Sequence, residues 1–288
     1  IRPMEIVPES DNKSPYTYRL TLANNGTETA PKTVWLKIRS LSENAYVPDS
    51  VQCTGGNIPG SSTYLYFNIK QQNILNNGDM VKIEVSVDKY NTSERDTFMV
   101  PAWYPSIETL YNGEDNLDNF DTEFWGTELR SDTSLYCLSD SPYGVPGNFV
   151  DLDLTTKNEV DLTTCSNAYL FLNVRWNIEG YIDFSTIQAS SDGGKTWKNL
   201  WSDRMKYGIG EANTRQPATL CGFDGCMPSP IAQYCSLHDF IGKKILIKFS
   251  SLTDYSLSRD GMQINQIAIH RFSGDSSVEN EKGNFFNA

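Results

Sequence analysis

The feature that most constrains the fold is a two-residue alternation of apolar and polar side chains in short segments. In residues 32–40, the apolar side chains of Val34, Leu36 and Ile38 occupy every second position. Because successive side chains of a strand point to opposite faces, this pattern predicts half-buried β-strands. The alternation recurs in residues 16–22, 62–70 and 80–87, and no helical period of useful length interrupts it. Short strands in this number over roughly the first hundred residues predict an immunoglobulin-like β-sandwich.

Strand candidates resume between Ile107 and Phe272 on a larger scale, with longer connections. This favours a jelly-roll β-sandwich and gives an all-β fold class. Between Ser202 and Cys235 a Gly- and Pro-containing stretch predicts an irregular insertion. The predicted organisation is an immunoglobulin-like sandwich at 1–102, a Pro-containing linker at 103–106, a jelly roll (galactose-binding or MAM-like) at 107–273 and a polar tail at 274–288.

Composition excludes several classes of partner. The 288 residues carry a formal net charge of −12, which argues against nucleic acid because phosphates need a basic face. The longest apolar runs are far too short for membrane insertion. An acidic chain is compatible with calcium, which takes oxygen ligands. The chain opens at Ile1 without an initiator Met or a signal peptide, so we expect a piece of a longer precursor.

The six cysteines allow 15 pairings if all are bridged. Cys221 and Cys226 close a short loop that contains glycine, and this pair is the predicted disulfide. Only Cys53 precedes the predicted domain boundary, so at least one other thiol is free or pairs across domains. A zinc site is disfavoured, because Cys235 and His238 are the only neighbours near ligand spacing.

Residues 190–197, SSDGGKTW, fit the pattern called an Asp-box, with Ser190, Asp192, Gly194 and Trp197 at its defining positions. An Asp at the head of a tight turn accepts backbone N–H bonds two residues on, and glycine supplies positive φ. We expect the tryptophan ring to lie under the hairpin. The role of the motif is therefore structural, and a propeller sialidase is excluded because its blades would need several such boxes at a regular period.

The surroundings of the box carry a family resemblance. Residues 160–200 precede and include it, and "CSLHDFIGKKILIKFSSLTD" and "RDGMQINQIAIHRF" follow. This order resembles the jelly-roll modules of secreted bacterial proteases, namely immune-inhibitor-A-type, carboxypeptidase-T-like and gingipain adhesin-like proteins, and it is similar to the reelin subrepeat. The segment "LANNGTETAPKTVWLKIRSLSENAYV" resembles the immunoglobulin-like domains that follow the catalytic domain in such proteases. The resemblance implies a secreted or cell-surface, non-catalytic accessory region.

The resemblance also implies a calcium ion near the first and last strands. Asp121 stands where such families often place a carboxylate, and Asn265, followed by Gln266, stands where many carry two aspartates. The loss of two charges predicts lower affinity. The alternative interpretation, in which Asp121 is an ordinary turn carboxylate, stays open.

No catalytic site is predicted, so we expect this fragment not to be an enzyme. The chain has two histidines and lacks H-E-x-x-H, G-x-S-x-G and Gly-rich phosphate motifs. Trp201, Arg204 and Tyr207 form the candidate ligand site, because aromatic faces stack on sugar rings and Arg supplies hydrogen bonds. Alternatively, Trp201 packs beneath the insertion.

The predicted function is an accessory or adhesion region of a secreted protein, with a protease as the expected parent. It would recognise a protein or glycan, or position the catalytic domain. The alternative is a carbohydrate-binding module or part of a glycoside hydrolase.

Overall fold

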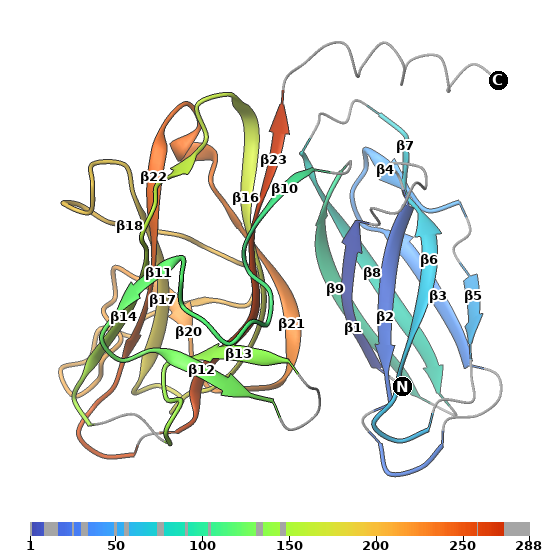
Figure 1. Cartoon of the computed structure of the whole chain (residues 1–288). Coiled ribbons are helices and arrows are strands. Elements are labelled where there is room, and N and C mark those ends of the chain that lie inside the picture. Colours follow the sequence, from blue (N-terminus) through green and yellow to red (C-terminus); the bar gives the residue numbers. More distant parts are fainter. Residues whose placement is uncertain are drawn as a thin grey trace.

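The computed structural model describes most of the chain as β-strands arranged in two sandwich-like bodies (Figure 1). The described residues contain no α-helix, and their one helical turn is the 3₁₀ segment η1 (His238–Phe240). The all-β prediction is confirmed. The residues described are 2–8, 17–24, 26–29, 34–48, 51–54, 58–73, 78–89, 92–102, 105–130, 135–144, 148–257 and 259–273.

The N-terminal sandwich encloses its own apolar core between two sheets. In β3 (Val34–Ser40), Val34, Leu36 and Ile38 are buried while the alternate side chains are exposed, as the sequence pattern predicts. Tyr18 crosses the core, and its hydroxyl donates to the carbonyl of Pro101 at 2.6 Å. One sheet has the order β1 (Arg2–Pro8), β2 (Thr17–Ala23), β6 (Ser62–Asn68), and the other β5 (Val51–Thr54), β3, β8 (Met80–Lys89), β9 (Thr92–Pro101); β4 (Ala45–Tyr46) pairs with β7 (Lys70–Gln71).

The C-terminal sandwich packs a six-stranded sheet on an eight-stranded sheet. Its core contains Leu170, Leu172 and Ile264 from the first sheet and Ile187 and Phe249 from the second, all at or near zero exposure. The six-stranded sheet has the order β12 (Gly126–Leu129), β13 (Tyr136–Ser139), β23 (Gly261–Ser273), β16 (Cys165–Asn177), β21 (Cys226–Ser236), and β10 (Ser106–Tyr111) also pairs with β23. The eight-stranded sheet has the order β11 (Phe120–Thr122), β14 (Asp151–Thr156), β22 (Lys244–Leu252), β17 (Phe184–Ser190), β20 (Cys221–Phe223), β19 (Lys206–Tyr207), with β15 (Val160–Asp161) on β22 and β18 (Lys198–Asn199) on β17.

The predicted irregular insertion at 202–235 is partly wrong, because most of its second half is the long strand β21. The sequence CMPSPIAQYCS carries Pro228 and Pro230, which lack the N–H that a central strand needs. The structure accommodates them because β21 lies at the edge of its sheet and pairs with β16 alone. The prolines marked an edge strand rather than a loop.

The two sandwiches meet along a packed junction. On the outer face of the six-stranded sheet, Tyr169, Phe171, Tyr234 and Phe272 form a buried cluster, and Val7 and Met80 of the N-terminal sandwich pack against it. Two side chains also donate hydrogen bonds to the carbonyl of Gly78: the Tyr169 hydroxyl at 2.7 Å and Asn167 Nδ2 at 3.0 Å. We call these six apolar residues, with the bonds to Gly78, the junction.

The predicted domain boundaries stay predictions. Residues 103–104 of the linker and the tail at 274–288 lie outside the described residues, and β10 begins at Ser106. The described residues form no helix with the length and apolar character that crossing a bilayer requires.

Candidate functional site

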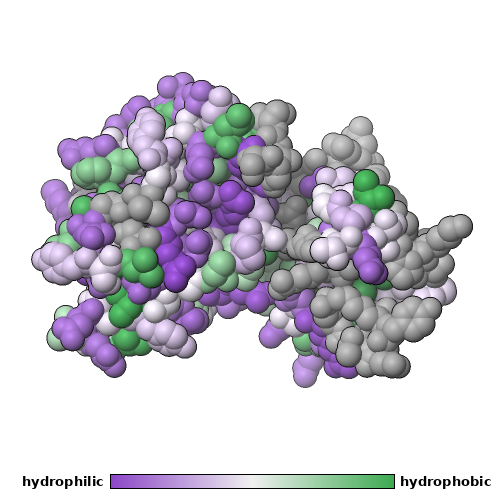
Figure 2. All heavy atoms as spheres, turned by 90° about the horizontal axis from the view of Figure 1, so that it is seen from below, coloured by the Kyte–Doolittle hydropathy of each residue, from purple (hydrophilic) through white to green (hydrophobic). Residues whose placement is uncertain are grey.

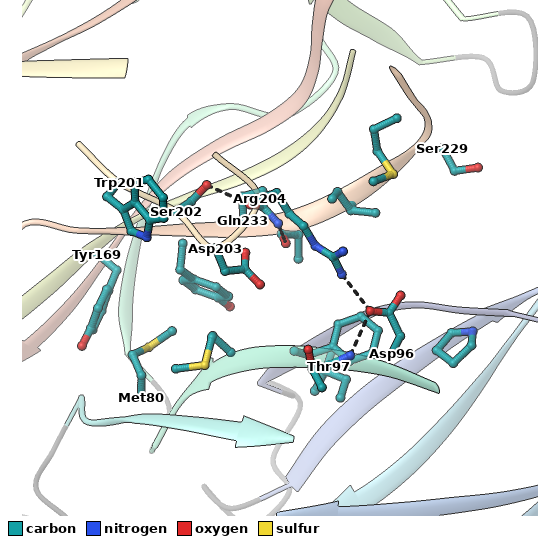
Figure 3. Close-up of a pocket in the computed structure, with 18 of the residues that line it drawn as sticks. Met80, Asp96, Thr97, Tyr169, Trp201, Ser202, Asp203, Arg204, Ser229 and Gln233 are labelled. Atoms are coloured by element: carbon teal, nitrogen blue, oxygen red, sulfur yellow. Dashed lines mark hydrogen bonds and ion pairs between the residues drawn. The ribbon is translucent and has the colours of Figure 1, made fainter. Parts of the chain in front are cut away.

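A cavity of about 340 Å³ lies beside the junction, between the two sandwiches. Strands β1 and β9 line it from the N-terminal side, and β21 with residues 201–204 lines it from the C-terminal side (Figure 3). Apolar groups dominate the wall, among them Ile6, Phe98, Met99 and Met227. The volume falls within the range of small-molecule pockets, and so does a wall that is mainly apolar with few polar groups.

The segment that carries the predicted ligand residues follows the Asp-box hairpin directly. Trp201 lines the cavity and is 47% exposed, and its ring stacks on Tyr207, which is 70% exposed, at 5.5 Å between centroids. The structure therefore brings two of the three predicted residues together as an exposed aromatic pair. The alternative, that Trp201 is covered by the insertion, does not fit this exposure.

Arg204, the third predicted residue, reaches across the cavity to the other sandwich. Its Nη2 lies 2.7 Å from Oδ1 of Asp96 on β9 (Figure 3). The same Asp96 oxygen accepts the backbone N–H of Thr97 at 2.8 Å, which fixes the carboxylate. Arg204 thus forms an ion pair that spans the two sandwiches as well as a wall of the cavity. No sequence pattern indicates this partner, because 108 positions separate the two residues.

Polar groups sit at the base of the same wall. The Ser202 hydroxyl donates to Oε1 of Gln233 on β21 at 2.8 Å, and both residues are buried. Loss of water around its carboxyl raises the pKa of Asp203, and the charge of Arg204 acts in the opposite direction. The described lining includes no histidine or cysteine, so it offers no nucleophile with an adjacent imidazole base.

The Asp-box forms the hairpin between β17 and β18. Oδ1 of Asp192 accepts the N–H groups of Lys195 and Thr196 at 3.0 and 2.9 Å, three and four residues on rather than the expected two. The hydroxyl and the N–H of Thr196, with Ser190, hold the pKa of the Asp192 carboxyl well below its usual range. Gly193 and Gly194 have φ of 73° and 84°. Trp197 is half-buried, and Lys248 Nζ lies 4.8 Å from its ring centroid.

The predicted disulfide between Cys221 and Cys226 is wrong, because both thiols are free. Cys221 lies on β20 in the eight-stranded sheet and its Sγ donates to the carbonyl of Leu200 at 3.1 Å. Cys226 begins β21 in the six-stranded sheet and is exposed. The short loop connects two different sheets, so the two cysteines belong to different layers of the sandwich. The side chain of Cys53 lies outside the described residues.

The residues expected to hold calcium are placed on different sheets. Asp121 is exposed on β11 and faces Thr155 across the eight-stranded sheet. Asn265 lies on β23 in the six-stranded sheet, and its Nδ2 donates to Oδ1 of Asn173 at 2.8 Å. The structure gives these two residues no shared contact. The calcium assignment at this pair stays a prediction.

The surface of the C-terminal sandwich shows no extended apolar face in the view of Figure 2. Hydrophobic residues form small separate patches among hydrophilic ones. Single exposed apolar side chains are normal for a soluble protein. Trp201 is distinguished by its place in the cavity wall, where its ring stacks on that of Tyr207, not by hydrophobicity alone.

Comparison with known proteins supports the resemblance seen in the sequence. Residues 143–281, just under half of the chain, match the family described as "Immune inhibitor A-like, MAM domain". No curated protein matches the chain. Among solved structures, one described as "Structural basis for the promiscuous specificity of the carbohydrate-binding modules from the beta-sandwich super family" has a TM-score of 0.30 and 11% identity, covering 91% of this chain and 94% of that one.

A second solved structure, the serine-rich repeat protein Srr2 from Streptococcus agalactiae, has a TM-score of 0.19 and 8% identity, covering 95% of this chain and 92% of that one. Similarities at this level carry no argument about function. The family match does support an inference about the role of this region, because it covers β14 to β23, the strands that build most of the C-terminal sandwich. This part of the chain is thus similar to the MAM domain of immune inhibitor A-like proteins, a non-catalytic accessory or binding domain.

Proposed function

We propose that the chain is the accessory region of a secreted, immune-inhibitor-A-like protease and that the cavity between its sandwiches binds a glycan. The observation that carries the proposal is the exposed ring of Trp201 in the cavity wall, which stacks on the exposed ring of Tyr207 next to the cavity. A pyranose ring stacks on such a surface through its C–H groups, and its hydroxyls need charged or amide partners close by. Asp203 and Arg204 supply them within the same segment.

A glycan array probed with the full chain tests this proposal, followed by titration calorimetry with the best oligosaccharide. We expect Trp201→Ala to weaken binding about tenfold, the effect of losing one aromatic stacking contact. Trp35→Ala is the matched control, because Trp35 is 54% exposed on β3 and does not line the cavity. Absence of any bound glycan, or equal weakening by both variants, would contradict the proposal.

A second candidate role is to position the parent catalytic domain, and the junction favours it. Aromatic packing, two hydrogen bonds to Gly78 and the Arg204–Asp96 ion pair join the sandwiches through independent contacts. Such an interface holds the two bodies at one angle. Small-angle X-ray scattering tests this role. We expect the unmodified chain to give the profile of a single compact particle and Tyr169→Ala to give a broader distribution of dimensions.

A further inference from the structure

Two loops meet at one end of the C-terminal sandwich and bring acidic residues together. Residues 178–183 connect β16 to β17, and residues 253–257 follow β22. Strands β17 and β22 pair antiparallel with Phe184 opposite Leu252, so the segments next to this pair emerge side by side. Carboxylate oxygens of Glu179, Asp183 and Asp254 consequently lie within 4.8 Å of one another. We call these three residues the acidic loop group.

Hydrogen bonds supply donors to both oxygens of Asp254 but not to every oxygen of the acidic loop group. Ser256 donates to Asp254 through its N–H, 2.8 Å from Oδ1, and through its hydroxyl, 3.0 Å from Oδ1 and 3.1 Å from Oδ2. Asp183 is only 4% exposed, and its carboxylate accepts one bond, to Oδ1, from the N–H of Asp254 at 2.8 Å. Oε2 of Glu179 is fully buried and has no hydrogen-bond partner among the described residues. An anionic oxygen that leaves water without a donor or a cation costs several kcal/mol.

A fourth carboxylate, that of Asp140, lies beside Asp183. Asp140 follows β13, is 3% exposed, and lines a hollow of about 10 Å³ together with Asp183 and Arg259. Its Oδ2 accepts the N–H of Met262 at 3.0 Å, while its buried Oδ1 has no hydrogen-bond partner. A buried carboxyl with one unpartnered oxygen therefore lines the same small hollow as Asp183, and it comes from outside the two loops.

The described cations do not neutralise the group. Arg215 is the positive charge that acts on Asp183, but its guanidinium pairs with Asp151 and lies 4.5 Å from the Phe149 ring centroid. No ion pair joins a described Lys or Arg to Glu179, Asp183 or Asp254. Three carboxylates whose oxygens lie within 4.8 Å of one another repel each other unless a proton or a cation offsets their charge.

We propose that Glu179, Asp183 and Asp254 bind a divalent cation, with calcium as the preferred ion. The donors are carboxylate oxygens without a thiol or imidazole, which is the set that a hard cation selects over zinc or copper. The site is separate from the Asp121 and Asn265 pair expected from the sequence. It is also separate from the glycan proposal, because none of its residues lines the large cavity.

Bound calcium would fasten several segments at this end of the sandwich. The carbonyl of Asp254 accepts the N–H of Phe149 at 2.6 Å, and the carbonyl of Asp183 accepts Nε2 of Gln216 at 2.9 Å. The carbonyl of Ile182 accepts the N–H of Arg215 at 2.8 Å. Holding the three carboxylates together therefore ties residues 148–150 and 214–217 to the two loops.

Thermal melting and titration calorimetry of the full chain at pH 7.5, with calcium chloride or with a chelator, test the site. We expect millimolar calcium to raise the Tm by about 5 °C or more, the effect of a ligand near one hundred times its Kd. Asp183→Asn and, separately, Glu179→Gln should each reduce calcium affinity at least tenfold while leaving the Tm in chelator unchanged or higher, because each removes a buried charge.

Asp121→Asn is the matched control, because it removes an exposed carboxylate on β11. It should keep the full calcium response, and so should Trp201→Ala, which separates this test from that of the glycan proposal. The proposal is overturned if the unmodified chain shows neither binding heat nor a Tm change, or if Asp121→Asn abolishes the response while Asp183→Asn retains it. Should Asp183→Asn fail to fold, Glu179→Gln alone decides between the two results.

Discussion

The junction and the acidic loop group differ in whether their buried polar groups have partners of opposite charge or hydrogen-bond donors. At the junction, Tyr169 donates to Gly78 and aromatic rings fill the remaining space, and in the cavity beside it Arg204 pairs with Asp96. In the acidic loop group, carboxylates cluster while Oε2 of Glu179 lacks a donor. The first arrangement provides partners for the polar groups that bridge the two sandwiches, and its one unpartnered ring nitrogen, Nδ1 of His270, belongs to a side chain whose low pKa keeps it neutral. The second becomes favourable only with a proton or a cation, because desolvated charge needs a partner. The contrast separates a structural contact from a ligand site.

The largest expected effect comes from the packing of the junction. Phe171 is 4% exposed, with its ring centroid 5.1 Å from that of Tyr234 and 5.0 Å from that of His270. Phe171→Ala should lower the free energy of unfolding by about 3–5 kcal/mol, measured by urea denaturation. Phe149→Ala is the control near the acidic loops, where the ring is 48% exposed, and its loss should cost about 1 kcal/mol. Equal losses of unfolding free energy in the two variants would contradict the view that the junction is the more tightly packed region.

The next effect concerns Asp140, whose pKa burial raises to about 6. The folded state then keeps this proton to higher pH than the unfolded chain, whose ordinary Asp pKa is about 3.9. Stability from this group is full below pH 4 and is lost as the pH rises through 6. In chelator, the stability of Asp140→Asn relative to the unmodified chain should rise by about 2.3 kcal/mol between pH 4 and pH 7. Denaturant melts at several pH values measure it, and a constant difference would refute the assignment.

A smaller effect of the opposite sign belongs to His270 at the junction. Burial lowers the pKa of His270 to about 4, so the folded state resists a proton that the unfolded chain takes up near pH 6.5. Stability is therefore present above pH 6.5 and is lost as the pH falls through 4. His270→Phe removes the titrating group. The free energy of unfolding of this variant minus that of the unmodified chain should therefore be about 2 kcal/mol larger at pH 5 than at pH 7.5. If the unfolding free energies of the variant and the unmodified chain changed with pH in parallel, His270 would not be the titrating group.

The smallest effect is that of the ion pair across the cavity. The side chains of Arg204 and Asp96 are 33% and 20% exposed, so solvent screens their attraction. A double-mutant cycle of Arg204→Met and Asp96→Asn should give a coupling energy of about 0.5–1 kcal/mol, falling in high salt. Coupling of zero at low salt would show that the pair does not contribute to holding the sandwiches together.

Strand positions followed from the sequence where one face of a strand is buried. In β3 the alternation of Val34, Leu36 and Ile38 assigned each side chain to its face, because the period of a strand is two residues and local order decides it. The strand β21 escaped prediction because its prolines look like loop signals until the edge of the sheet is known. Trp201 and Tyr207 could be proposed as neighbours for a similar reason, since six positions along one segment keep them close.

What the sequence by itself determined is the all-β class, the Asp-box turn and the absence of catalytic motifs, since each depends on residues close together in the chain. Only the tertiary structure decided which distant residues meet. It separated Cys221 from Cys226 onto two sheets, paired Arg204 with Asp96, and gathered Glu179, Asp183 and Asp254 at one end of a sandwich. The physical reason is that strand pairing across 70 or more positions has no signature in local periodicity, so charges that share one small volume are invisible until the sheets are assembled.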